Sequence, residues 1–318
     1  MEIYLGSEED RQYIKTYLAN IRQLDPIEIA TLPNPITLAN PLLEEVIDLN
    51  QFWGIVSQSL DECEKRYGIR LNLLKPERYY TSQPVEDNDI GGFYSPHSLG
   101  YQYWYHGAFV IMLSNKVASR KLRTLEFARD FLHDCFHFST FVSFRRVLRT
   151  PAKSPADAKH CVPEVYREQY GINFRNEEGL SYSAKTLTAY SPETINLNLL
   201  MDGVIVLTVA ELMRQTSGDV AKNMNALEEE IRKEIFLEPF DIAMFPRAHG
   251  FHNAVTDPSR IFVEHWGGMN LVTLVLQAMM NGNLQPLKDF FEKKVGTSNA
   301  WEKKFRRSGF SIVAEPEF

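Results

Sequence analysis

A helix that carries two histidines on one face is the feature that most restricts how this chain can fold. Apolar residues at positions 125–136 recur at helical spacing, and Thr124 can cap the start of the helix. His133 and His137 stand four positions apart in FLHDCFHFSTF, so they lie one turn apart on the same face. Two imidazoles in this arrangement can bind one metal ion, and zinc accepts neutral imidazole readily.

The remaining pattern predicts an α+β protein with an excess of helix. The run YQYWYHGAFVIMLS at 101–114 is rich in aromatic and branched residues and predicts a strand or hairpin. Helical spacing predicts helices at 9–24, 42–67, 177–188, 196–216, 220–236, 270–280 and 284–294.

Prolines, a Gly-Gly pair and acidic residues gather at 75–99 and predict an irregular loop. We place a domain boundary there. Residues 1–90 are expected to form a mainly helical N-terminal region. Residues 91–318 are expected to hold the metal-binding domain with a helical C-terminal subdomain.

Composition excludes several kinds of partner. A net charge of -7 leaves no basic surface for nucleic acid, which needs clustered Lys and Arg. The longest apolar runs, 203–210 and 271–280, are about half of the ~20 residues that crossing a bilayer requires. The first residues lack the pattern of a secretory signal, so we expect a cytoplasmic protein, with signal-less export left open. The 3 cysteines are too few for a disulfide framework.

A catalytic zinc site keeps three protein ligands and an open position for water. The stretch FRNEEGLSYSAKTLTAY contains Glu177 and Glu178 at the start of a predicted helix. Glu178 stands 41 positions after His137 (178 minus 137), so a separate helix could deliver it to the same ion. Asp134 follows His133 directly, points close to the same face, and could take a proton from the metal-bound water.

These parts together resemble the gluzincin branch of the zinc metallopeptidases. The shared features are a strand ending in an apolar run, a helix with two histidines four apart, and a later helix opening with Asn-Glu-Gly-Leu or a close variant. The resemblance implies that His133, His137 and Glu178 bind zinc, that Asp134 replaces the catalytic glutamate, and that Glu177 is a neighbour of the ligands. It also implies a zincin-like core of a short sheet with an active-site helix, and a peptide or protein substrate.

The resemblance spans about residues 101–215, and in it FVIMLS is the edge strand along which a peptide substrate lies. Zinc-bound water, deprotonated by Asp134, would attack the peptide carbonyl. Asp134 is one methylene shorter than the glutamate of the family, so its reach bears on the rate. The residue that stabilises the oxyanion stays open among Tyr182, Tyr190, His249, His252 and His265.

The segment FLHDCFHFSTF, which carries the two histidines, also resembles the Leu-His-Asp motif of HD-domain phosphohydrolases. That resemblance implies a metal bound by His133 and Asp134, with His97 as the earlier ligand, Asp202 as the last, and a nucleotide phosphate as substrate. The HD-domain fold needs a helix after His97, where the pattern predicts an extended run, and it gives no role to Glu178 or His137. A third alternative is a metal-stabilised binding protein without catalysis. We expect the metallopeptidase.

Overall fold

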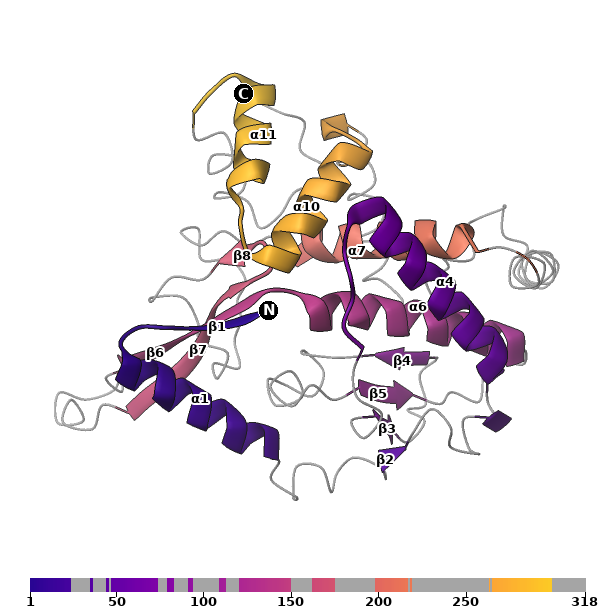
Figure 1. Ribbon diagram of the computed structural model, residues 1–318, viewed down its shortest axis with the longest axis horizontal. Helices are drawn as coiled ribbons and strands as arrows, with labels where there is room; N and C mark the ends of the chain where they lie inside the picture. The colour runs from indigo at the N-terminus through magenta and orange to yellow at the C-terminus, as the bar shows by residue number, and fades with distance from the viewer. Residues whose placement is uncertain are drawn as a thin grey trace.

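Helices and strands are interspersed along the chain, and the prediction of an α+β protein is confirmed by the computed structural model (Figure 1). Within the part of the chain that it describes there are six helices and two four-stranded sheets. The described residues are 1–23, 35–36, 44–45, 47–73, 79–82, 91–93, 109–112, 120–149, 162–174, 198–216, 218, 263 and 265–298.

The helices are α1 (Glu8–Gln23), α4 (Leu49–Tyr67), α6 (Arg120–Ser139), α7 (Asn198–Arg214), α10 (Met269–Asn281) and α11 (Gln285–Val295). The strands are β1 (Glu2–Leu5), β2 (Pro35–Ile36), β3 (Tyr79–Ser82), β4 (Gly91–Phe93), β5 (Phe109–Met112), β6 (Val142–Arg149), β7 (Val162–Tyr170) and β8 (Asn173–Phe174). Helices predicted at 9–24, 42–67, 196–216, 270–280 and 284–294 are confirmed, apart from their boundaries. Those predicted at 177–188 and 220–236 lie outside the described residues.

One sheet has the order β1-β6-β7-β8. β1 runs parallel to β6, while β6, β7 and β8 form antiparallel pairs. Helix α1 covers one face, where Ile14 and Leu18 pack against Val142, Phe144 and Val165. This apolar contact fixes the N-terminal helix to a sheet that the sequence pattern did not predict.

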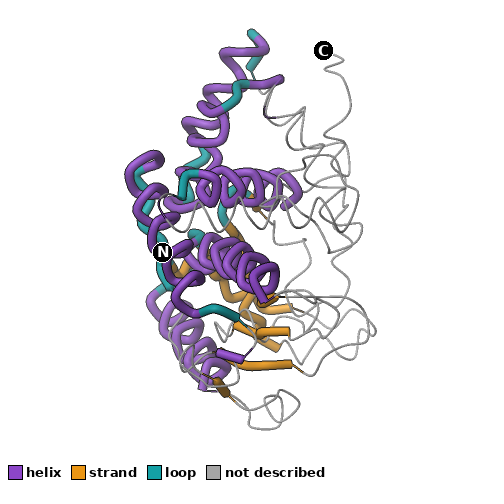
Figure 2. The backbone as a smooth tube through the Cα atoms, turned by 90° about the vertical axis from the view of Figure 1, so that its right-hand side faces the viewer, coloured by secondary structure: helices purple, strands orange, loops and turns teal. Residues whose placement is uncertain are grey.

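The other sheet has the order β2-β3-β5-β4, with β3 parallel to β5 and β4 antiparallel to it at the edge. Helix α6 lies against β4. Figure 1 labels these strands below α6, and Figure 2 shows strands and helices from the side.

Two details of the predicted strand pattern are wrong. The region 75–99, predicted as irregular, contains β3 and β4. The segment FVIM is β5, which pairs on both sides with β3 and β4, so the edge strand beside α6 is β4. Strands from either side of residue 90 pair in both sheets, and the domain division at that residue stays a prediction.

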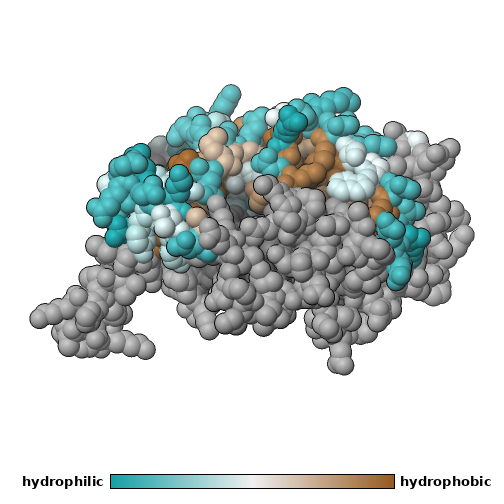
Figure 3. Space-filling model, turned by 60° about the horizontal axis from the view of Figure 1, so that its bottom comes forward, coloured by the Kyte–Doolittle hydropathy of each residue, from teal (hydrophilic) through white to brown (hydrophobic). Residues whose placement is uncertain are grey.

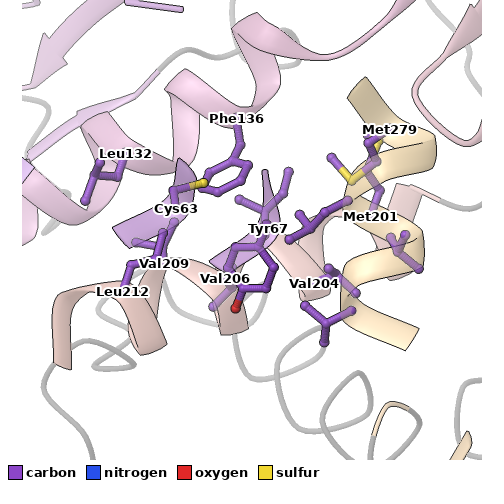
Figure 4. Close-up of a cluster of buried hydrophobic side chains, with 14 of the residues drawn as sticks. Cys63, Tyr67, Leu132, Phe136, Met201, Val204, Val206, Val209, Leu212 and Met279 are labelled. Carbon is purple, nitrogen blue, oxygen red and sulfur yellow. The ribbon is translucent and has the colours of Figure 1, made fainter. Parts of the chain in front are cut away.

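The main core lies where α4, α6, α7 and α10 meet, and Figure 4 shows apolar side chains from these helices in contact range. Phe52 on α4 packs against Phe127 and Phe131 on α6, with ring centroids 4.9 and 5.3 Å apart. Thr124 lies inside α6, not at its start. Its hydroxyl donates to Arg120 O and accepts the Asp48 N–H, both at 2.8 Å, so it ties α6 to the beginning of α4.

The described residues that are visible on the face drawn in Figure 3 are mostly hydrophilic. Figure 3 shows hydrophilic residues over much of the coloured surface, with hydrophobic ones between them. Among the described helices, none has both the length and the apolar run that crossing a membrane requires.

Candidate metal centre

Helix α6 brings His133 and His137 together near its C-terminal end. Their Nε2 atoms are 2.9 Å apart, and the ring centroids are 4.7 Å apart at an interplanar angle of 55°. His137 is buried, with 8% of its surface exposed, whereas His133 is half-buried. The prediction that the two histidines share one helix face is confirmed, and their role as metal ligands stays a prediction.

The spacing of the two nitrogens fits a shared zinc ion. Zinc binds imidazole nitrogen at about 2.0–2.1 Å in a tetrahedral arrangement, which puts two ligand nitrogens about 3.3 Å apart. The observed 2.9 Å differs by a few tenths of an ångström, which a small side-chain rotation supplies. The same 2.9 Å is the length of an N–H···N hydrogen bond, so without metal one Nε2 carries a proton and the other accepts it.

The second nitrogen of His137 meets a tyrosine from the neighbouring sheet. Tyr170, the last residue of β7, has its hydroxyl oxygen 2.6 Å from Nδ1 of His137 and 3.4 Å from the His137 carbonyl oxygen. Tyr170 is buried, and the buried guanidinium of Arg167 lies 4.0 Å from the centroid of its ring. The sequence analysis missed Tyr170, because 33 positions separate it from His137 and no local motif marks it.

Backbone and hydroxyl contacts hold the last turn of α6. Thr140 donates its N–H to His137 O at 3.2 Å and its hydroxyl to Phe136 O at 2.8 Å. Ser139 accepts the Asn72 N–H at 2.7 Å. His137 therefore sits at the carbonyl end of a fixed helix, where the helix dipole favours a bound cation.

Comparisons of the chain with protein-family models, with curated proteins and with solved structures gave no match. The resemblance to the gluzincins accordingly stays a prediction that rests on His133, His137 and Glu178.

Asp134 lies on α6 between the two histidines in sequence and is buried, with 3% of its surface exposed. The pKa of the adjacent Cys135 thiol is raised well above its usual value, mainly by burial and to a smaller extent by the charge of Asp134. Among the described residues, no three of the His, Cys, Asp and Glu side chains gather in a group that could hold a metal. A third ligand is therefore not found beside the pair in this part of the chain.

Most of the other predicted site residues lie outside the described parts: His97, Glu177, Glu178, Tyr182, Tyr190, His249 and His252. Asp202 belongs to α7, and its side chain is likewise outside the description. His265 is exposed, with its ring edge-on to Trp266 at a centroid distance of 5.7 Å.

Proposed function

We propose that this protein is a zinc-dependent hydrolase, a metallopeptidase that acts on peptide or protein substrates. His133 and His137 would hold the ion together with Glu178, and Asp134 would act as the general base. The observation that carries the proposal is the 2.9 Å approach of the two Nε2 atoms from successive turns of α6.

The surroundings of the pair support zinc. Imidazole nitrogen is a preferred zinc donor, and a ligand histidine normally uses its other ring nitrogen in a hydrogen bond, as His137 does with Tyr170. His137 is buried while His133 is half-buried. One side of the pair is therefore enclosed and the other is closer to solvent, as a site that admits water and substrate requires.

The chemistry divides between the ion and the chain. Bound zinc supplies Lewis acidity, which lowers the pKa of a water molecule to about 7 and polarises a carbonyl. Asp134 accepts the proton of the attacking water and returns it to the leaving amine, as a general base and then a general acid. Because its side chain is shorter than that of glutamate, its distance from the water sets the rate.

An extended peptide is the substrate class that suits the sheet beside α6. β4 is the last strand in the order of its sheet, pairs with β5, and lies against α6. A peptide can add to an edge strand through main-chain hydrogen bonds, and Gly91 and Gly92 leave the backbone of β4 without side chains at two of three positions. A zincin-like core, with its active-site helix beside an edge strand, is part of this proposal.

Metal analysis tests the site. Mass-spectrometric zinc measurement should give about one ion per chain in the wild type, and loss of the ion in His133→Ala and His137→Ala. Glu178→Ala should also lose zinc. His265→Ala, which removes an exposed histidine, is the matched control and should retain it. Full zinc occupancy in both His133→Ala and His137→Ala would refute the site.

Peptide cleavage tests the reaction. Asp134→Ala should lose turnover at unchanged zinc content, and Asp134→Glu should keep or gain activity, because it restores the longer carboxylate. Chelators should inhibit the wild type. If zinc is retained in Glu178→Ala but lost in Asp202→Ala, the result would favour the phosphohydrolase. If neither the wild type nor Asp134→Glu cleaves peptides, although both bind zinc, the result would favour a metal-stabilised binding protein.

A further inference from the structure

We infer that Tyr170 is a positioning residue for His137: its hydroxyl oxygen accepts the Nδ1–H of the imidazole, so Nε2 keeps its lone pair and faces His133. The consequence for zinc rests on the proposed function. The protonation of the ring nitrogens is independent of the proposed function, because the same hydrogen bond is present without metal.

The direction of the hydrogen bonds is part of this inference, and it is consistent with the protons that each group carries. A neutral imidazole has one N–H and one lone pair, and a phenol has one O–H that rotates to suit its acceptor. The Tyr170 hydroxyl reaches the His137 carbonyl oxygen at 3.4 Å and can donate there. Its oxygen then accepts from Nδ1 at 2.6 Å, which leaves the lone pair on Nε2. His133 donates its Nε2–H to that lone pair at 2.9 Å.

A bulge in β7 decides on which face of the sheet Tyr170 lies. Ser143 pairs with Gln169 and Phe144 with Arg167, so Glu168 is an extra residue in β7. One extra residue shifts the alternation of side chains by one position. Tyr170 thereby lies on the same face as Arg167, three positions before it, whose guanidinium is 4.0 Å from the tyrosine ring centroid.

The backbone on both sides of Tyr170 is anchored. Gly171 donates its N–H to Phe141 O at 2.8 Å, which joins the end of β7 to the residue before β6. The side-chain amide of Gln169 donates to Gly171 O at 2.9 Å and to Gly282 O at 2.8 Å. Tyr170 is thus held between two fixed residues, and its hydroxyl can define the rotation of the His137 ring.

This arrangement has a consequence for metal affinity. A hydrogen bond from the second nitrogen of a ligand histidine fixes its tautomer and its ring orientation, and loss of such a partner typically costs about 10–100-fold in metal affinity. Tyr170→Phe keeps the aromatic ring beneath Arg167 and removes only the hydroxyl. Tyr166→Phe is the matched control, since Tyr166 is buried on the same strand and its hydroxyl lies 3.4 Å from the Glu168 carboxylate.

The first test needs no metal. Long-range ¹H–¹⁵N NMR of ¹⁵N-histidine-labelled, zinc-free protein should show His137, assigned by its absence in His137→Ala, as the Nδ1–H tautomer in the wild type and in Tyr166→Phe. Tyr170→Phe should show a mixture of both tautomers. An Nε2–H tautomer in the wild type, or no change in Tyr170→Phe, would overturn the inference.

The second test is zinc affinity, measured by competition with a chelator. Tyr170→Phe should bind about 10–100-fold more weakly than the wild type and Tyr166→Phe, and its cobalt complex should have a shifted absorption spectrum. Equal affinity in all three proteins would overturn the positioning role and leave the proposed zinc site standing. A wild type that binds no zinc would refute the proposed function, and the tautomer measurement would still decide the role of Tyr170.

Discussion

Substitution of Gly282 tests how tightly the end of α10 packs against Phe141. Gly282 ends α10 at φ 75°, and a Cβ there would lie 2.6 Å from Cε1 and 2.7 Å from Cγ of Phe141. Carbon atoms in van der Waals contact are about 3.5–4.0 Å apart, so the ring must move by about 1 Å. The backbone of Phe141 is held in place, because its N–H donates to Met279 O and its carbonyl accepts the Gly171 N–H, both at 2.8 Å, and its ring is buried.

The expected loss has two parts. The left-handed conformation costs a residue with a Cβ about 1–2 kcal/mol, and overpacking against Phe141 costs about 1–3 kcal/mol. Gly282→Ala should therefore lower the free energy of unfolding by about 2–5 kcal/mol. Gly296→Ala is the matched control: Gly296 ends α11 at the same φ of 75°, and a Cβ there meets nothing within 4 Å.

Urea unfolding followed by circular dichroism and tryptophan fluorescence measures both free energies. The control should lose only the conformational part, about 1–2 kcal/mol. The two variants should therefore differ by about 1–3 kcal/mol, which is the contribution of the clash. Losses that agree within about 0.5 kcal/mol would show that the Phe141 ring moves aside freely, and the close packing inferred here would be refuted.

Two further predictions concern α4. Asp48 accepts the Gln51 N–H at 3.0 Å, so Asp48→Ala should lower the free energy of unfolding by about 1 kcal/mol in urea melts, and Asp48→Asn by much less; equal losses would contradict capping. Burial raises the pKa of Cys63, shown within the core in Figure 4, from 9.0 to about 12. The thiol loses its proton at a lower pH in the unfolded chain than in the folded protein, so the free energy of unfolding of the wild type falls as pH rises above about 9. Cys63→Ala lacks this thiol, so its stability relative to the wild type should increase over the same pH range. A difference constant up to about pH 10.5 in urea melts would contradict this.

The helices that sequence predicts well are those whose apolar residues recur at spacings of three and four. On α10 the buried residues Leu271, Val272, Val275, Leu276 and Met279 stand three and four positions apart, so the periodicity in the sequence is also the pattern of burial. A cap at Thr124 would start the helix at residue 125, whereas α6 begins at Arg120; the Thr124 hydroxyl contacts Asp48, from a distant segment, and does not cap its own helix. Such a contact cannot be read from local spacing.

The sheet of β1, β6, β7 and β8 escaped prediction because charged pairs take the place of apolar ones. Arg145 on β6 forms an ion pair with Glu168 on β7, and Arg146 reaches Asp10 on α1 at 3.4 Å. The extra residue at Glu168 also breaks the two-residue alternation that marks a strand. The two-residue alternation that predicts a strand is therefore interrupted within β7.

Helix α6 sets the spacing of His133 and His137, and strand β7 sets the orientation of the His137 ring. An imidazole at a fixed position on a helix can still rotate about its side-chain torsions, so the spacing of His133 and His137 does not determine which nitrogen faces the partner. Tyr170 contacts Nδ1 of His137 and thereby selects Nε2. Because the bulge at Glu168 decides on which face Tyr170 lies, the orientation of a residue on α6 depends on the residue count of β7. A histidine motif alone therefore predicts where a metal could bind, and the position of Tyr170 on β7 decides which nitrogen of His137 faces His133.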